Sequence, residues 1–235
     1  MIISVHQPHF LPWIGYINKI MNSEVFVVLD TVQYRKNYYQ NRVLIKNHDG
    51  TPFWLSVPVK RAHLETPICE IVISGKEWKK KATKTIESIY SKTPFFHELY
   101  PSLYEIIMCD FNKLSHLNIA LLKWLMEKLD IKTKIHIASD LGIHSNNPND
   151  RLIKICKHFN ASCYIAGKGG RNYLDERLFN GNGIKVIYQV FNPSETIYRQ
   201  INGDFLPGLS VIDLLFNEGS DRSHDIIKNA WKANV

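Results

Sequence analysis

The beginning of the chain gathers side chains suited to acid–base chemistry. An apolar run over residues 2–5 is followed by two imidazoles, an amide, an indole and a phenol: His6, Gln7, His9, Trp13 and Tyr16. A second apolar run, 25–29, ends at Asp30. Neighbouring parallel strands end at one edge of a sheet, so Asp30 is expected beside this loop, where it could orient a histidine as a general base. The predicted catalytic residues are therefore His6, His9 and Asp30, with Gln7, Trp13 and Tyr16 contacting substrate.

A purely structural interpretation of this segment stays open. In that interpretation Trp13 and Tyr16 belong to the core, and Asp30 caps the turn after its strand. Pro8 and Pro12 favour a site instead, because proline fixes φ and so holds the neighbouring polar groups in place.

The segment 30–42 is dense in aromatic, amide and cationic side chains and poor in aliphatic ones. A guanidinium suits a phosphate, amides suit sugar hydroxyls, and a tyrosine ring suits a base or a pyranose. We therefore predict that Tyr34, Asn41 and Arg42 bind substrate. A polar surface loop is the alternative interpretation.

A glycine-rich segment follows the apolar run 163–166. Glycines let backbone N–H groups approach a phosphate or carboxylate, and neighbouring cations add charge. The spacing matches neither G-x-x-x-x-G-K-[ST] nor G-x-G-x-x-G, so this is no standard nucleotide loop, and a simple turn is the alternative. The substrate-binding residues predicted here are Gly167, Lys168, Gly169, Gly170, Arg171 and Tyr173.

The composition argues against several classes of protein. The 235 residues include four cysteines without a C-x-x-C pair and ten histidines without ligand spacing, so we expect no metal site and reduced thiols in a cytoplasm. No run reaches the roughly 18–20 apolar residues of a membrane span, and no signal peptide is expected. Gly-x-Ser-x-Gly is absent, which leaves an α/β-hydrolase without its nucleophile.

The net charge of +7 is compatible with a basic surface or with an anionic partner such as a phosphate ester or nucleic acid. Basic residues cluster over 76–84, at the start of an expected helix. Such a run is most often a solvated helix face, and a docking patch for an acidic carrier or tRNA is the alternative.

Hydrophobic periodicity predicts an α/β fold: a mostly parallel sheet flanked by helices, with a β-hairpin extension. We expect one domain over 1–235 with a helical insertion at about 77–129. Asp213, on the last expected helix, is interpreted either as a buried structural carboxylate or as a site residue. The expected strands are 2–5, 25–29, 43–45, 53–57, 68–73, 134–138, 163–166 and 184–190, and the expected helices are 14–21, 77–91, 95–109, 112–129, 151–159 and 209–217, the last ending near Gly219.

Together these residues resemble the WbqC-like protein family almost from end to end. The string Gln7-Pro8…Leu11-Pro12-Trp13-Ile14-Gly15-Tyr16 carries the most specific likeness. A serine commonly precedes the central glycine in this family where the chain has Ala166, so this chain lacks one ligand contact if that hydroxyl binds ligand. The further matching strings lie within 30–42, 55–59, 164–174 and 209–215.

The resemblance implies a function, because the family is associated with bacterial O-antigen and other surface-polysaccharide gene sets. It implies a transferase that forms an amide between a glycine-type aminoacyl or acyl group and a nucleotide-linked amino sugar. On this resemblance His6, His9 and Asp30 would take the proton from the sugar ammonium, while Arg42 and the loop 167–171 would bind the diphosphate. The donor stays open between an aminoacyl-tRNA, an acyl-carrier-protein thioester and an adenylate, and no cofactor is identified.

The first loop is also similar to the phosphate-binding loop of nucleotidylyltransferases, whose pattern ends H-x-G-H. Here Trp13 and Tyr16 stand at the two histidine positions. This similarity supports a parallel sheet and gives an alternative function, an ATP-dependent ligase or nucleotidyltransferase-like enzyme. A third hypothesis is a non-catalytic partner that binds a sugar nucleotide or a carrier.

Overall fold

A six-stranded sheet forms the centre of the molecule, in the order β5-β2-β1-β6-β7-β8. The structure, a computed structural model, describes residues 1–234. All neighbouring strands are parallel except β7 and β8. The expected α/β fold with a mostly parallel sheet is therefore confirmed. The strands are β1 Ile2–His6, β2 Val25–Val28, β5 Lys134–Ile137, β6 Cys163–Ala166, β7 Lys185–Val190 and β8 Lys232–Asn234.

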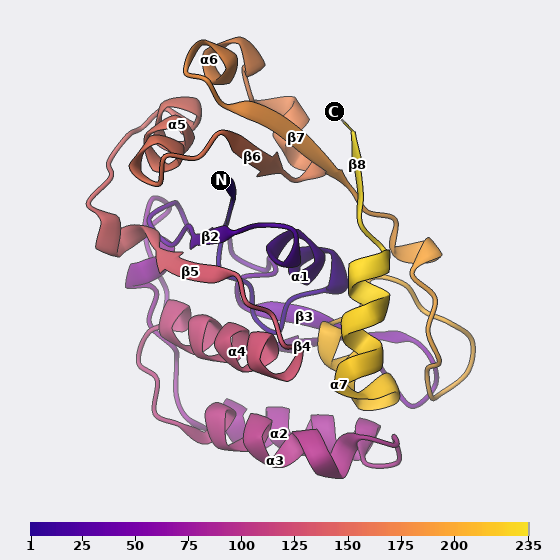
Figure 1. Cartoon of the computed structure of the whole chain (residues 1–235). Coiled ribbons are helices and arrows are strands. Elements are labelled where there is room, and N and C mark those ends of the chain that lie inside the picture. Colours follow the sequence, from indigo (N-terminus) through magenta and orange to yellow (C-terminus); the bar gives the residue numbers. More distant parts are fainter. Residues whose placement is uncertain (235) are drawn as a thin grey trace.

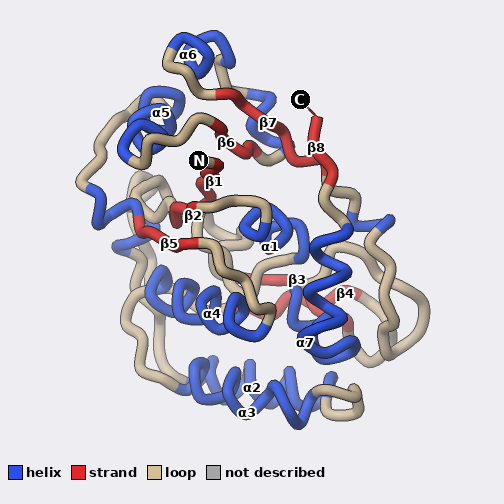
Figure 2. Tube along the Cα trace, viewed as in Figure 1, coloured by secondary structure: helices blue, strands red, loops and turns tan. Residues whose placement is uncertain are grey.

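Helices cover both faces of this sheet. Phe26 and Val28 of β2 pack with the apolar residues of α1, α4 and α7, whereas Val25 and Val27 pack with those of α5 and α6. This alternation is the period-two pattern of a strand buried on both sides. In Figure 2 the strands separate α5 and α6 from α1, α4 and α7. The helices are α1 Ile14–Met21, α2 Glu77–Tyr90, α3 Phe96–Met108, α4 Leu114–Lys128, α5 Pro148–His158, α6 Glu176–Gly181 and α7 Val211–Asn229.

The strand order reverses at β1. The chain passes from β1 outward to β2 and then β5, and β6 returns to the opposite side of β1 before β7 follows. In open α/β sheets, ligands bind in the crevice that such a reversal leaves at the carboxyl ends of the strands. The crevice between β1 and β6 is therefore the first place in this fold to search for a site.

The hairpin and the helical insertion form one end of the molecule. Strands β3 (Arg42–Lys46) and β4 (Pro52–Ser56) pair antiparallel in a sheet of their own. Figure 1 shows α2 and α3 beside each other at the end far from α6, with α4 between them and the sheet. Their apolar residues join those of α1 and β2 in one continuous cluster, so the insertion shares the core of the sheet.

Two expected elements differ from the structure. Residues 68–73 do not form a strand, because the amides of Ile68 and Cys69 bond the carbonyls of Val32 and Asp30, and a 3-10 turn forms over Ile68–Glu70. The last helix also extends further than expected. Its first stretch does end at Gly219, whose φ of 75° and ψ of 177° are not helical, and a second stretch after this kink continues α7 to Asn229.

Asp213 lies in the first turn of α7 and is fully buried. Its two carboxylate oxygens accept hydrogen bonds from the hydroxyls of Tyr90, at 2.9 Å, and Tyr198, at 2.8 Å. Burial raises the pKa of Asp213 to about 6, although both phenols act in the opposite direction. These contacts join α7 to α2 and to the segment that precedes α7, which favours the structural interpretation of Asp213.

Gly15 fits closely between two aromatic side chains. A Cβ atom at this position would lie 2.4 Å from the ring of Trp13 and 2.9 Å from that of Phe191. The Trp13 and Phe191 rings pack edge to face with centroids 5.3 Å apart. The glycine in the string Trp13-Ile14-Gly15 is therefore needed to hold the loop after β1 against the segment after β7.

We expect Gly15→Ala to lower the free energy of unfolding by about 1–3 kcal/mol, the usual cost of overpacking a core. Urea unfolding followed by tryptophan fluorescence would measure the change. Gly181→Ala is the matched control, because nothing lies within 4 Å of its Cβ position in α6, and helical alanine should be neutral or stabilising there. Equal midpoints for Gly15→Ala and the unaltered protein would contradict this packing constraint.

Candidate functional site

Three of the predicted groups reach the same edge of the sheet. His6 ends β1, Asp30 follows β2, and Gly167 follows β6. Strand β1 pairs in parallel with both neighbours, with His6 opposite Val28 and Ser4 opposite Ile165. The carboxyl ends of all three strands therefore meet around the crevice where the strand order reverses.

The two histidines and Tyr16 form one cluster. The ring centroids of His6 and His9 are 4.7 Å apart, and those of His6 and Tyr16 are 4.8 Å apart. The ring of His9 lies between Tyr16, at 5.0 Å, and Tyr39, at 5.6 Å, and stacks on both. His6 Nδ1 and the Tyr16 hydroxyl each lie 3.1 Å from the carbonyl of Gln7. The cluster is thus fixed by ring packing and by one backbone carbonyl.

His9 is the least satisfied of these side chains. It is 4% exposed, and neither ring nitrogen has a hydrogen-bond partner among residues 1–234. An unpaired buried polar group costs about 1–3 kcal/mol, so a protein rarely keeps one without a use for it. Both nitrogens of His9 are thus buried and unpaired within the cluster.

Lys19 is a buried neighbour of this cluster that the sequence interpretation missed. It lies one helical turn after Tyr16 on α1, is 3% exposed, and donates a hydrogen bond to the carbonyl of Val5 at 3.1 Å. No carboxylate within the described residues forms an ion pair with it. A lysine on the same helical face as Tyr16 and Ser23, both at a spacing of three or four residues, was the available signal.

Burial without a counter-charge sets the protonation of this cluster. Desolvation lowers the pKa of Lys19 to about 7. Desolvation, with Lys19 as a second cause, lowers the pKa of His9 to about 3 and that of His6 well below its usual value. The imidazoles are therefore neutral at pH 7, and Lys19 is the group that exchanges a proton near neutrality.

Asp30 does not pair with either histidine. Its two carboxylate oxygens accept hydrogen bonds from the backbone amide and the hydroxyl of Ser139, at 3.0 and 2.8 Å. The expected neighbourhood of Asp30 and the first loop is found, but the carboxylate faces the segment after β5. In this structure Asp30 positions Ser139, and it orients no imidazole.

The segment 30–42 closes over the cluster. The side chain of Gln40 donates to Gln7 Oε1 at 2.8 Å, and the ring of Tyr39 reaches Trp54 on β4 with centroids 5.7 Å apart. The guanidinium of Arg42 lies 4.1 Å from the Trp54 ring. This predicted binding segment therefore adjoins His9 and continues into the hairpin.

Several polar atoms of this segment are buried and unpaired. Within the described chain, the Tyr34 hydroxyl, Asn41 Oδ1 and Arg42 Nε have no hydrogen-bond partner. The Asn41 amide nitrogen does donate to Val57 at 3.0 Å. All three predicted binding residues thus keep a polar group that a ligand could satisfy.

The glycine loop combines open and packed positions. A Cβ at Gly167 or Gly169 would meet nothing within 4 Å, whereas one at Gly170 would press on Leu174 at 2.9 Å. Lys168, Gly169, Arg171 and Tyr173 are exposed. The guanidinium of Arg171 lies 4.3 Å from the ring of Tyr188 on β7. The loop can therefore admit a ligand over Gly167 and Gly169, with Lys168 beside it.

Trp13 lies apart from the histidine cluster. Its ring packs on Phe191, and its backbone forms a bridge to Ser210. It lines a cavity of only about 10 Å³ with Tyr198 and Phe205, which has room for about one water molecule. Trp13 thus fixes the loop that carries His9 by packing on Phe191.

Comparison with known proteins assigns the chain to a family. The model of the WbqC-like protein family matches residues 7–225. This range includes His9 and the rest of the loop after β1, the hairpin and the glycine loop. This chain belongs to the WbqC-like protein family. A relative in Mycobacterium tuberculosis (strain ATCC 25618 / H37Rv), "Uncharacterized protein Rv1507c", is 31% identical over 221 residues, 93% of this chain and 94% of the relative. No solved structure matches the chain.

No group of three His, Cys, Asp or Glu side chains in 1–234 is arranged to hold a metal ion. Over the same residues, every helix is too short or too polar to cross a bilayer.

The proton affinity of Lys19 gives a test on stability. Between its folded pKa of about 7 and its usual 10.5, the unfolded chain binds a proton that the folded chain does not. The free energy of unfolding should therefore rise with pH, by at most about 1.4 kcal/mol per pH unit from this group. Lys19→Met should remove this rise in urea unfolding between pH 7 and 9. Lys123→Met, at an exposed lysine, is the control and should keep the rise of stability with pH. If Lys19→Met showed the same rise as the unaltered protein, Lys19 could not be deprotonated in the folded chain.

Proposed function

We propose that this WbqC-like protein transfers a glycine-type aminoacyl or acyl group to a nucleotide-linked amino sugar, in the biosynthesis of a bacterial surface polysaccharide such as O-antigen. One observation carries the proposal. Lys19 and the two imidazoles lie together at the crevice edge without a carboxylate, and Lys19 has a pKa of about 7. A base of that pKa is well matched to an ammonium substrate at neutral pH.

The reaction requires two protons to leave the acceptor nitrogen. Neutral Lys19 takes the first from the sugar ammonium, directly or through the uncharged imidazole of His9. The free amine then attacks the acyl carbonyl carbon, and a C–N bond forms while the bond from that carbon to the leaving group breaks. The leaving group departs with its electron pair and takes the second proton from nitrogen. Lys19 finally returns its proton to solvent.

The other predicted residues bind the sugar nucleotide. Gly167 and Gly169 offer open backbone beside Lys168, which suits the diphosphate. The unpaired Arg42 Nε suits the diphosphate as well, and the unpaired Tyr34 hydroxyl suits a sugar hydroxyl. His6 and Gln7 fix the position of the first loop, because His6 contacts the Gln7 carbonyl and the Gln7 side chain accepts a hydrogen bond from Gln40.

An ATP-dependent ligase or nucleotidyltransferase-like enzyme is the second candidate. The reversal of strand order between β1 and β6 favours it, because many doubly wound sheets bind nucleotides at such a crevice. Against it, Trp13 is occupied by packing on Phe191, so one of the two imidazole positions of the nucleotidylyltransferase loop serves the core here. A non-catalytic partner remains the third candidate.

A thermal-shift screen against UDP- and dTDP-linked amino sugars, ATP, AMP and acyl-coenzyme A distinguishes these functions. A ligand at 100 times its Kd should add about 2.7 kcal/mol of apparent stability. We expect a shift with an amino-sugar nucleotide and none with ATP or AMP. A shift with ATP alone would establish the ligase instead, and no shift at all would contradict a sugar-nucleotide enzyme.

Turnover separates the enzyme from a binding partner. With the nucleotide sugar found in the screen and glycyl-tRNA, glycyl-adenylate or an acyl thioester as donor, Lys19→Met should lower kcat by roughly 10²–10⁴ while the Kd for the sugar changes little. Lys123→Met is the control and should keep both values. If Lys19→Met and His9→Ala both kept full turnover, this base assignment would be wrong.

A further inference from the structure

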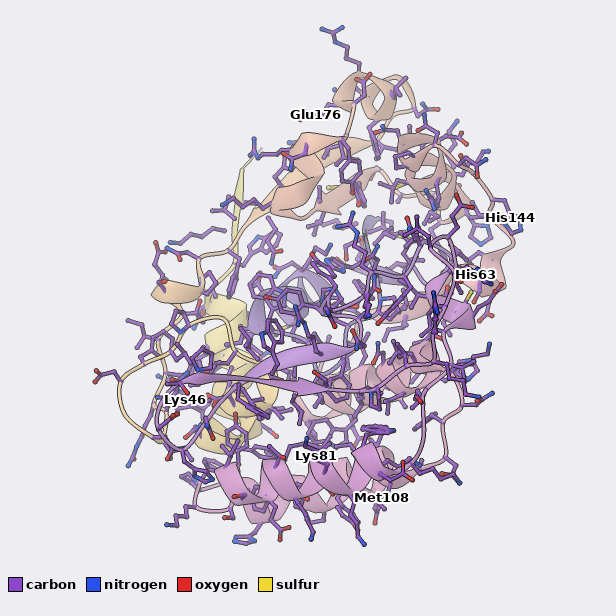
Figure 3. All side chains as sticks on the ribbon, turned by 180° about the vertical axis from the view of Figure 1, so that it is seen from behind. Lys46, His63, Lys81, Met108, His144 and Glu176 are labelled. Atoms are coloured by element: carbon purple, nitrogen blue, oxygen red, sulfur yellow. The ribbon has the colours of Figure 1, made fainter. Side chains whose placement is uncertain are left out.

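A groove lies between the hairpin and α2, away from the edge of the large sheet. It has a volume of about 320 Å³, within the size range of small-molecule sites. Its walls are the turn after β3, with Asn47 and His48, and the α2 face that carries Lys81, Lys84 and Ser88. Figure 3 shows Lys81 on α2, under the hairpin strand that ends at Lys46.

The basic run of α2 is divided between two faces of the helix. Lys76 and Lys79 both bind the carboxylate of Asp110, at 2.7 and 2.6 Å, so they stabilise the end of α3. Lys81 and Lys84 form no ion pair among the described residues, and both line the groove. The cations that the sequence grouped together over 76–84 thus differ: Lys79 is buried in an ion pair, and Lys81 and Lys84 are exposed in the groove.

The groove lining is cationic and contains no carboxylate. The nearby Asp49 is engaged by the amide and the hydroxyl of Thr51, at 3.0 and 2.6 Å. His48 Nε2 lies 3.0 Å from the hydroxyl of Ser88, which places an imidazole and a hydroxyl beside the two ammonium groups. Ammonium, imidazole and hydroxyl groups together suit phosphate oxygens.

An aromatic ring borders the same groove. Phe53 on β4 is 38% exposed and lines the groove together with Ile89. An exposed ring beside phosphate-binding cations is the arrangement that stacks a nucleobase while its phosphates are held. We propose that this groove binds the phosphorylated nucleotide portion of a small-molecule ligand.

The hairpin connects the groove to the histidine cluster. Lys46 and Pro52 pair at its groove end, and Arg42 and Ser56 pair at the other end, beside Tyr39 and His9. Four residue steps along a strand span roughly 14 Å. We assign the nucleotide of an extended acyl donor of the coenzyme A type to the groove. Phe53 and Trp54 are adjacent in β4 and lie on opposite faces of the hairpin, so the acyl end reaches the sheet edge around the edge of the hairpin. This assignment to the donor rests on the proposed function, whereas nucleotide binding in the groove does not.

Isothermal titration with adenosine 3′,5′-bisphosphate, and with pyrophosphate as a second probe, tests the groove. Lys81→Gln/Lys84→Gln should weaken both probes at least tenfold. Lys80→Gln/Lys123→Gln removes the same charge from exposed lysines outside the groove, and it should leave both affinities within about twofold. Phe53→Ala should weaken the bisphosphate several-fold and leave pyrophosphate unchanged, because only the bisphosphate has a base to stack.

Equal losses in the two double variants would overturn the groove, since they would reduce binding to general attraction by a basic protein. A tRNA acceptor-stem hairpin is a third probe. If it binds tightly, if Lys81→Gln/Lys84→Gln abolishes that binding, and if the bisphosphate does not bind, the proposal of a small-molecule ligand is overturned. The amino-sugar nucleotide is titrated on the same groove variant. If the groove variant keeps sugar-nucleotide binding and loses bisphosphate binding, the two ligands have separate sites. If the unaltered protein binds the bisphosphate in the groove but binds no amino-sugar nucleotide, only the proposed function is overturned.

Discussion

The position of β1 between β2 and β6 is the constraint on which the rest of the structure depends. Both pairings are parallel, so each neighbour must be reached by a crossover, and the chain leaves β1 on one side and returns on the other. This reversal opens the crevice at the carboxyl edge and brings the loops after β1, β2 and β6 together there. Residues separated by some 160 positions, such as His6 and Gly167, become neighbours in the sheet order for this reason alone.

The chemistry of this edge follows from the absence of a nearby negative charge in the described cluster. A carboxylate beside Lys19 would favour the ammonium form and hold its pKa high. Asp30 is close in the sheet order, but Ser139 occupies both of its oxygens. Desolvation is therefore the largest influence on Lys19 and His9, and it lowers both pKa values. A lysine that must remove a proton from a cation has to be uncharged at the working pH. Desolvation without a nearby carboxylate produces that state, whereas a lysine paired with a carboxylate would remain charged.

The sequence predicted the fold, and the meeting of the three loops at one sheet edge, better than the side-chain contacts at that edge. Period-two and helical patterns, which act locally, gave nearly all strands and helices and placed His6, Asp30 and Gly167 at one edge. The partner of Asp30 depends on Ser139, more than a hundred residues away, and no local pattern encodes that bond. Lys19 was missed because its burial depends on the packing of α1 under β1, whereas a lysine in a short amphipathic helix is usually exposed. Residues 68–73 were assigned wrongly because the amides of Ile68 and Cys69 find distant carbonyls.

The unpaired polar atoms show where the fold departs from maximum stability. Four residues with a buried, unpaired donor or acceptor, His9, Tyr34, Asn41 and Arg42, belong to the loops that border the crevice or to the hairpin that extends from it, while others, such as Trp78 on α2 and Ser223 on α7, lie in the helices. At about 1–3 kcal/mol each, these groups would amount to a substantial fraction of the stability of a domain. The stack of Tyr16, His9 and Tyr39 offsets part of that cost, since aromatic pairs contribute about 0.5–1.5 kcal/mol beyond the area that they bury. Aromatic packing therefore holds the ring of His9 in place while leaving both of its nitrogens free, which hydrogen bonds could not do.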